Sequence, residues 1–358
     1  MKYSIDNSAL SGSLNVSRPD AVRIGPVLAI PAVLAEFDVM PQRAFSLARV
    51  DYRLFQNPDS RISFEALGRL FESCVNLTNC NHFGLLVGDR FNLKGLGALG
   101  YLMSNSATVG DALHNLLLHL RMHDRGATPI LLRPDPALAL LGYSIYRYNT
   151  PATVQIYDAA ITIGHKILKE ICGTSWKSVR VQFSHSPPGD IRPYRRLFGT
   201  SLIFNAAVSG IAFSSDWLQI PVDGADNTVH SMIVKAVLEA ESNNPQSFSE
   251  QVKIVLHQLV LSGNASANSI AEQFGVSERT LRRRLEKEGK NLMQLVNSVR
   301  FELSQQLLQD TDLSVSEIAT ALQYSDPNIF SRAFRIWSTL SPTQWRALQQ
   351  RRNQHFEE

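Results

Sequence analysis

The apolar positions divide the chain into two parts with different periodicity. In the first 240 residues, stretches with apolar residues at helical spacing alternate with short strand-like runs. Helices are predicted at 64–75, 109–122, 152–172 and 229–240, and strands at 129–132, 138–146, 178–183 and 210–213. After residue 248 every periodic stretch is helical. We therefore expect an α+β domain followed by an all-α domain.

The polar segment 241–248 contains Pro245 and is typical of a connection between domains. We predict domains at 1–240 and 249–358, joined by this linker. A chain of 358 residues suits this division, because one domain commonly has ~100–200 residues.

The second part contains an internal repeat. Ile270 recurs as Ile318 at an offset of 48 residues and, after a one-residue insertion, Leu281 recurs as Phe330 at an offset of 49. Each copy has the pattern of a short helix, a tight turn and a second helix, and in such a motif the second helix enters the DNA major groove. We predict helix-turn-helix motifs at about 267–285 and 315–335.

The turns of both copies carry residues that favour this geometry. Gly275 can adopt a positive φ at no steric cost, and Ser277 can cap the second helix. In the second copy the cap is either Ser325 or Asp326. Pro327 follows in the first turn of the helix, where its missing N–H is harmless.

Between the two motifs, apolar residues at helical spacing predict one continuous helix over 292–309. Such a helix would be about 27 Å long. Successive major-groove segments on one face of B-DNA lie ~34 Å apart. A rigid helix of this length would hold the two second helices near adjacent grooves.

Charge changes this picture only locally. The formal net charge of +3 is too small to indicate a nucleic-acid partner. Four arginines, however, lie within six residues of the first motif: Arg279, Arg282, Arg283 and Arg284. Clustered arginines suit a surface that faces phosphates, because they displace condensed counterions from the duplex. The alternative is an ordinary solvated basic face of a helix.

Residues 252–352 resemble the DNA-binding domain of the AraC/XylS family of bacterial transcription regulators. The stretch 324–346, which begins Tyr-Ser-Asp-Pro-Asn-Ile-Phe-Ser-Arg-Ala-Phe, is similar to the family signature. The run Ser-Glu-Arg-Thr-Leu-Arg-Arg-Arg-Leu at 277–285 resembles the first recognition helix. Gln323 departs from the family, which often has glycine there; a non-glycine residue costs conformational energy in that turn without abolishing it.

The resemblance implies which residues contact DNA. They are Ser277, Arg279, Thr280, Arg282 and Arg283 in the first motif, and Asn328, Ser331 and Arg332 in the second. Arginine paired with guanine is the commonest specific contact, so we expect the first helix to supply more of the sequence discrimination. The aromatic residues expected in the core instead are Phe330, Phe334, Trp337 and Trp345.

Residues 44–240 resemble the arabinose-binding N-terminal domain shared by regulators similar to the ornithine-utilisation regulator. The similar stretches are 82–88, 96–100, 193–199 and 204–206. The resemblance implies a domain that binds a small-molecule effector and forms a homodimer, in a regulator that acts on double-stranded promoter DNA with RNA polymerase. It identifies neither the effector nor the residues that bind it. Activation of transcription is expected, although the sequence does not distinguish it from repression.

The sequence disfavours a membrane span, a signal peptide, a disulfide framework and a zinc site. No apolar run approaches the ~18 residues of a membrane span. The N-terminus lacks the features of a signal peptide. The three cysteines, Cys74, Cys80 and Cys172, form neither a disulfide framework nor a zinc motif. We expect a cytoplasmic protein without metal or cofactor.

Two motif-like patterns have structural explanations. The glycines of 95–100 fit G-x-G-x-x-G but lack the strand, helix and acidic residue of a dinucleotide site, so close helix packing is expected. His119 and His123 are spaced like metal ligands, yet no further ligands complete a set, and a surface or partly buried pair is expected.

Two alternative functions remain at this stage. One is an enzyme whose catalytic N-terminal domain is tethered to DNA, although no G-x-S-x-G or P-loop motif supports it. The other is a constitutive architectural DNA-binding protein, which the large first domain disfavours.

Overall fold

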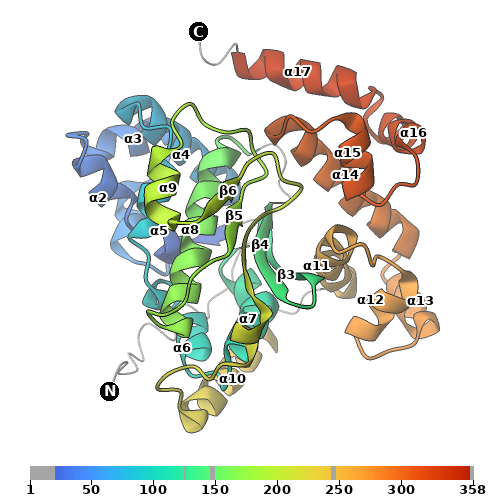
Figure 1. The fold of residues 1–358 in the computed structure, drawn as a ribbon, viewed down its shortest axis with the longest axis horizontal. Coiled ribbons are helices and arrows are strands. Elements are labelled where there is room, and N and C mark those ends of the chain that lie inside the picture. Colours follow the sequence, from blue (N-terminus) through green and yellow to red (C-terminus); the bar gives the residue numbers. More distant parts are fainter. Residues whose placement is uncertain (1–20, 125, 146–149, 243–246, 355–358) are drawn as a thin grey trace. The chain divides into compact units, whose positions relative to one another are not determined.

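The computed structural model describes residues 21–124, 126–145, 150–242 and 247–354. The chain forms two compact units, which are treated separately (Figure 1). The first comprises Met1–Gln182, Pro188–Leu202 and Ser209–Pro245, and the second Phe183–Pro187, Ile203–Val208 and Gln246–Glu358. Residues 243–246 of the expected linker lie outside the described residues.

The first unit is built on a five-stranded sheet with the strand order β3-β4-β7-β5-β6. Its strands are β3 (Ala127–Asp135), β4 (Leu138–Ile145), β5 (Arg180–Gln182), β6 (Ser201–Ile203) and β7 (Ser209–Ser214). Strand β4 pairs antiparallel with both neighbours, so that Leu141 lies opposite Leu131 on β3 and Ile211 on β7. A separate antiparallel pair joins β1 (Ala21–Arg23) to β2 (Arg61–Ser63).

Helices surround this sheet (Figure 1). They are α2 (Ile30–Ala35), α3 (Pro41–Ala48), α4 (Phe64–Thr78), α5 (Phe83–Asp89), α6 (Ala98–Ser104), α7 (Val109–His119), α8 (Thr153–Cys172), α9 (Arg192–Phe198) and α10 (Asn227–Ser242). Short 3-10 turns are η1 (Gly25–Val27), η2 (Tyr52–Gln56), η3 (Leu93–Leu96), η4 (Leu120–Met122) and η5 (Ser215–Gln219). The long α8 packs against β4 and β7, because its apolar face matches the buried face of these strands.

Glycines let α5 approach α8 closely. A Cβ atom added to Gly84 would lie 2.2 Å from the Gln155 carbonyl oxygen, so no larger residue fits. The Gln155 side chain fixes the same contact: its Oε1 accepts from the Gly84 N–H at 2.8 Å and its Nε2 donates to the Asn81 carbonyl at 2.8 Å. This contact explains the glycine at the start of the stretch 82–88.

The sequence predictions for this unit are confirmed at the level of fold class, with shifted ends. The predicted helix at 109–122 stops at His119 and continues as the 3-10 turn η4. The predicted strand at 178–183 is shorter, and Tyr146 of the predicted strand 138–146 lies outside the described residues. The expected linker also begins later than predicted, because Glu241 and Ser242 still belong to α10.

The dinucleotide-like glycines serve close packing, as expected. A Cβ on Gly100 would lie 2.0 Å from the Leu93 carbonyl oxygen. The sheet pairings of this unit given above are antiparallel, whereas a dinucleotide fingerprint needs parallel βαβ units. Cys74 is fully buried in the apolar stripe of α4, where burial raises the pKa of its thiol.

The expectation for His119 and His123 is wrong, because both side chains are buried and they make different contacts. His119 Nδ1 lies 3.0 Å from Glu241 Oε1, and Arg121 shares this carboxylate at 2.8 Å. His123 lies beyond the end of α7 with 1% of its surface exposed. The two imidazoles therefore do not share a helix face. The described residues contain no cluster of three potential metal ligands.

From residue 248 the second unit is entirely helical in its described part. Its helices are α11 (Phe248–Leu261), α12 (Ala267–Gln273), α13 (Glu278–Lys287), α14 (Leu292–Asp310), α15 (Val315–Ala321), α16 (Pro327–Ser338) and α17 (Pro342–Gln354). Apolar residues from most of these helices form one core, which includes Leu256, Leu281, Val299 and Phe330. In the described part of the chain no helix is long and apolar enough to cross a membrane.

Candidate nucleic-acid interface

The structure confirms the two helix-turn-helix copies. α12 and α15 each have seven residues and begin 48 residues apart, while α13 and α16 begin 49 residues apart. Their caps repeat in the same way: Ser266 and Ser314 cap the first helices, and Ser277 and Asp326 cap the second. The one-residue insertion therefore lies inside the second turn.

The capping atoms settle the choice that the sequence leaves open. Asp326 Oδ1 accepts a hydrogen bond from the Asn328 N–H at 2.6 Å, so Asp326 rather than Ser325 caps α16. Pro327 occupies the first position of the helix, where no N–H is needed. In the first copy, Ser277 Oγ accepts from the Thr280 N–H at 3.3 Å.

The residues predicted to contact DNA occupy matching positions on the two second helices. An offset of 49 pairs Arg279 with Asn328, Arg282 with Ser331, and Arg283 with Arg332. Thr280 and Ser331 are partly buried and the other six, Ser277 included, are exposed. The opposite faces of both helices are buried in the core through Leu281, Leu285, Phe330 and Phe334.

Neighbouring contacts distinguish the four clustered arginines. The Arg284 guanidinium lies 5.4 Å above the Phe248 ring, a cation–π contact that directs it toward α11. Arg282 forms an exposed pair with Glu278 at 3.4 Å, which is a weak interaction that DNA phosphates can displace. Among the described residues, Arg279 and Arg283 have no ion-pair partner.

Glu288 and Arg284 fix the position of α13 against α11. Both Glu288 carboxylate oxygens accept from the first N–H groups of α11, Phe248 at 2.7 Å and Ser249 at 2.9 Å. These hydrogen bonds lower the pKa of Glu288, because the N-terminus of a helix favours negative charge. The recognition helix α13 is thus held at its C-terminal end, leaving its first turns exposed.

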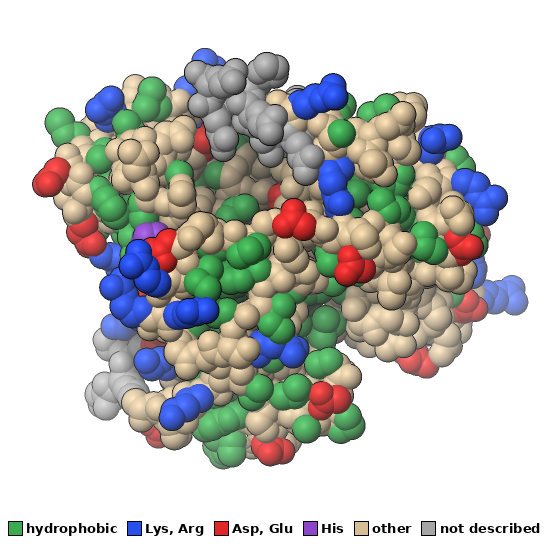
Figure 2. All heavy atoms as spheres, turned by 45° about the horizontal axis from the view of Figure 1, so that its top comes forward, with side chains coloured by type: hydrophobic (Ala, Val, Ile, Leu, Met, Phe, Trp, Pro, Cys, Tyr) green, Lys and Arg blue, Asp and Glu red, His purple; other side chains and the backbone are tan. Residues whose placement is uncertain are grey.

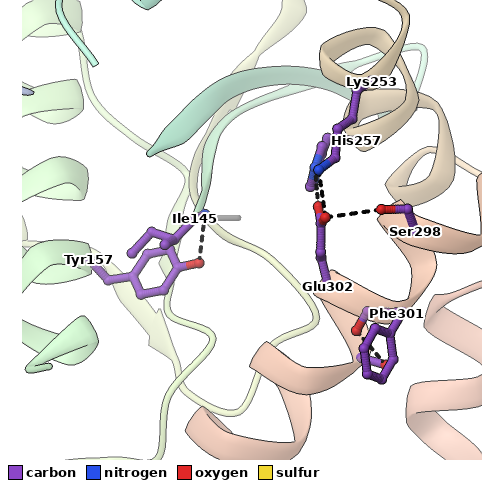
Figure 3. A network of polar contacts seen from close by, with 8 residues as sticks. Ile145, Tyr157, Lys253, His257, Ser298, Phe301 and Glu302 are labelled. Atoms are coloured by element: carbon purple, nitrogen blue, oxygen red, sulfur yellow. Dashed lines mark hydrogen bonds and ion pairs between the residues drawn. The ribbon is translucent and has the colours of Figure 1, made fainter. Parts of the chain in front are cut away.

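A partly buried polar cluster holds α11 to the connecting helix α14. Glu302 pairs with Lys253 at 2.5 Å and with His257 at 3.4 Å, and Ser298 Oγ donates to Glu302 Oε1 at 3.1 Å (Figure 3). Burial would raise the pKa of Glu302, but the contacts with His257 and Lys253 outweigh it and lower the pKa. The cluster therefore contains an ionised carboxylate at neutral pH.

The connecting helix α14 has 19 residues, which corresponds to about 28 Å. Arg346, from α17, ties its end to the second motif: Nε donates to the Leu308 carbonyl at 3.1 Å and Nη2 donates to the Leu313 carbonyl at 2.6 Å. Trp345 is buried and Trp337 packs on Phe301 with ring centroids 5.5 Å apart. The aromatic residues of the signature therefore form core contacts, as expected.

Sequence reasoning missed the residues that position the recognition helices. Glu288, Glu302 and Arg346 lie on different helices from the groups that they bind. In the sequence each of them is an ordinary charged residue, with no motif around it. No periodic pattern identifies the partner of such a residue.

The charged surface is mixed rather than uniformly basic. Figure 2 shows basic and acidic side chains interspersed across the face that it draws, in agreement with a formal net charge of only +3. The face that Figure 2 draws therefore has no large region of a single sign that would attract a polyanion over a long range.

Comparisons with known proteins agree with this arrangement. Residues 39–222, more than half of the chain, match the model of the arabinose-binding domain of AraC transcription regulators, N-terminal, and residues 270–348 match a helix-turn-helix domain. The ornithine utilization regulator of Pseudomonas aeruginosa is 28% identical over 88% of this chain and 93% of its own. The transcriptional regulator VirS of Mycobacterium tuberculosis is 25% identical over 81% of this chain and 85% of its own.

One solved structure matches over most of the chain. The crystal structure of the transcriptional regulator CdpR from Pseudomonas aeruginosa covers 86% of this chain and 96% of its own, with 22% identity and a TM-score of 0.43. The family models cover both units. This chain belongs to the AraC family of transcription regulators that carry an arabinose-binding-type N-terminal domain and a helix-turn-helix DNA-binding domain.

Proposed function

We propose that the two motifs read promoter DNA together through the exposed faces of α13 and α16. The contacting residues are Ser277, Arg279, Thr280, Arg282, Arg283, Asn328, Ser331 and Arg332. The observation that carries this proposal is the repeat of helix bounds, caps and polar positions at offsets of 48 and 49. The two helices pack on a common core through equivalent positions, and they expose equivalent positions to solvent.

The remaining parts of the proposal concern assembly and outcome. We infer a homodimer that activates transcription in the cytoplasm through RNA polymerase. Sedimentation of the purified chain at micromolar concentration tests the dimer, and transcription from a bound promoter with purified RNA polymerase tests activation.

We further propose that the chain acts by binding rather than by catalysis. The relatives named above are transcription regulators, and nothing in the comparisons supports a tethered enzyme. The first unit then has the task of sensing an effector, which also separates this protein from a constitutive architectural binder.

The test of DNA recognition compares two neighbouring arginines in the full chain. Arg283→Ala is expected to weaken binding to the preferred promoter fragment by ~1–3 kcal/mol and to relax the preference at one base pair. Arg284→Ala is the matched control, because its side chain packs on Phe248, and it should leave sequence preference unchanged. Fluorescence anisotropy at several salt concentrations measures both.

The outcome of this test separates base contacts from phosphate contacts. Equal weakening on all sequences, with a smaller salt slope, would assign Arg283 to a phosphate. Unchanged binding by the Arg283 variant on every fragment would contradict the proposed interface.

A further inference from the structure

The first unit contains an apolar cavity between α8 and the sheet. Its volume is about 100 Å³, and it is partly open to solvent. Ile156, Ile163 and Ile167 of α8 line one side, and Leu141 and Ile211 of the sheet line another. Ligand cavities in proteins commonly have mostly apolar walls with a few polar groups.

Among the described residues that line the cavity, three have a polar side chain: His123, Asp124 and Tyr143. Two of them satisfy each other, because the Tyr143 hydroxyl donates to Asp124 Oδ2. The other oxygen, Oδ1, accepts from the Gly126 N–H at 2.7 Å. Burial raises the pKa of Asp124 to about 6, so this carboxylate is mainly ionised at pH 7.5.

The His123 imidazole differs from the other two polar groups of the lining in its hydrogen bonding. The side chain is 1% exposed, and neither ring nitrogen has a hydrogen-bond partner among the described residues. The backbone is fixed, since the His123 carbonyl accepts from the Arg23 N–H at 2.7 Å and Asp124 forms a bridge with Val22. A buried polar group without a partner is rare in native proteins and suggests that something else satisfies it.

The charge state of His123 follows from its surroundings. Burial lowers its pKa well below the usual value, and the positive charges of Arg23 and Arg61 lower the pKa further. The ring is therefore neutral at physiological pH, with one N–H donor and one acceptor nitrogen. It can bind an uncharged polar group, but it cannot supply a positive charge to an anion.

We propose that this cavity is the effector site and that it takes a largely apolar small molecule with one uncharged polar head, a hydroxyl or a carbonyl, which hydrogen-bonds to His123. The proposal rests on the effector-controlled regulation of this family. It adds the place of the site and the chemical class of its ligand.

The neighbouring charges argue for an uncharged head. An anionic head would meet the Asp124 carboxylate, and Arg23 is already committed: it pairs with Asp59 at 2.6 Å and its Nη1 donates to the Gly95 carbonyl. A cationic head that binds His123 would be repelled by Arg23 and Arg61, whose positive charges also lower the pKa of His123. An anionic head buried beside the Asp124 carboxylate is unfavourable.

The experiment measures the binding of three probes with the same eight-carbon chain to the full-length protein at pH 7.5. The probes are octan-1-ol, octanoate and octylamine, and ligand-observed NMR and the shift of the thermal unfolding midpoint report binding. Octan-1-ol is expected to bind at least tenfold more tightly than either ion. Equal affinity for all three, or no binding of any probe, would overturn the proposal.

Matched variants connect binding to His123. His123→Phe keeps an aromatic ring and removes both nitrogens, so it should weaken octan-1-ol binding at least tenfold. His114→Phe makes the same change at an exposed position of α7 and should alter nothing. Retained octan-1-ol affinity in His123→Phe would contradict the assignment. If that variant does not fold, Ala160→Phe, which fills the cavity from α8, should abolish binding, and retained binding would count against the site.

Binding to DNA is measured on the same samples without any probe. A wild-type chain that binds octan-1-ol through His123 but no promoter fragment would contradict the proposed function and leave the cavity assignment intact. A chain that binds promoter DNA but no probe would contradict the cavity assignment and leave the proposed function intact.

Discussion

Gln323 has the same left-handed backbone conformation as Gly275, its counterpart 48 residues earlier, with φ of 62° against 59°. The side chain of Gln323 compensates for the unfavourable φ. Its Nε2 donates to the Leu259 carbonyl at 3.1 Å and also to that of Val260, both in the last turn of α11. The departure from the family pattern thus ties the second turn to the end of another helix.

Substitutions at Gln323 should therefore rank in an unusual order. Gln323→Ala keeps the left-handed strain and loses the hydrogen bonds, so we expect a loss of about 1–2 kcal/mol in the free energy of unfolding. Gln323→Gly loses the same bonds but removes strain of about 1 kcal/mol, so it should be the more stable variant. Urea unfolding of the full chain, followed by circular dichroism, measures the ranking.

A matched control comes from the first copy. Gly275→Ala introduces strain without a steric clash, because nothing lies within 4 Å of an added Cβ, and should cost about 1 kcal/mol. If alanine proved more stable than glycine at position 323, the compensating role of the side chain would be wrong.

The Glu302 cluster gives the second unit a pH-dependent stability. Glu302→Gln should cost about 2 kcal/mol at pH 7, because it removes the charge that Lys253 and His257 face. The folded-state pKa of Glu302 lies below its ordinary value of 4.5. Its contribution is therefore present above pH 4.5 and disappears as the pH falls through the folded-state pKa.

Unfolding measured from pH 7 to pH 3 checks this sign. The difference between the wild type and Glu302→Gln should shrink below pH 4.5. Glu278→Gln, which removes an exposed pair with Arg282, should change stability by less than about 0.5 kcal/mol. A difference that grew on acidification would contradict the direction of the Glu302 shift.

Glu288 should affect DNA binding through the position of α13 rather than through contact. Glu288→Ala removes the two acceptors for the Phe248 and Ser249 N–H groups. We expect affinity to fall about twofold to fivefold on all sequences alike, the effect of losing ~0.3–1 kcal/mol of interaction at a helix terminus. A changed base preference in competition binding would show instead that Glu288 itself faces the DNA.

The repeat could be predicted from the sequence because its signals are local. Capping residues, a turn glycine and apolar residues at helical spacing act within a few positions, so the helices at 267–285 and 315–335 follow from the residues themselves. The cavity could not be predicted in this way. Ile156, Ile163 and Ile167 look like an ordinary core stripe, and only the tertiary structure shows that no side chain of the described residues fills the space that they face.

The burial of His123 could not be predicted from the sequence either. Its spacing from His119 predicts a shared helix face, but α7 ends at His119 and the chain turns into the interior. The burial of a polar residue depends on contacts with Arg23 and Val22, which lie about a hundred residues away in the sequence. Short-range patterns contain no information about such contacts.

The two recognition helices should differ in how much sequence they discriminate. Arg279 and Asn328 occupy equivalent positions, and arginine with guanine is the commoner specific pair. Arg279→Ala should cost ~1–3 kcal/mol at its preferred base pair, and Asn328→Ala should cost less. Competition binding with single-base variants of a selected operator compares them, and a larger effect at Asn328 would reverse the expected order.

The central claim is that both motifs engage one DNA duplex at the same time. Hydroxyl-radical footprinting of the full chain on a selected promoter fragment tests it most directly. We predict two protected segments about one helical turn apart on one face, with Arg283→Ala weakening one segment and Arg332→Ala the other. A single protected segment, or two variants that weaken the same one, would contradict the claim.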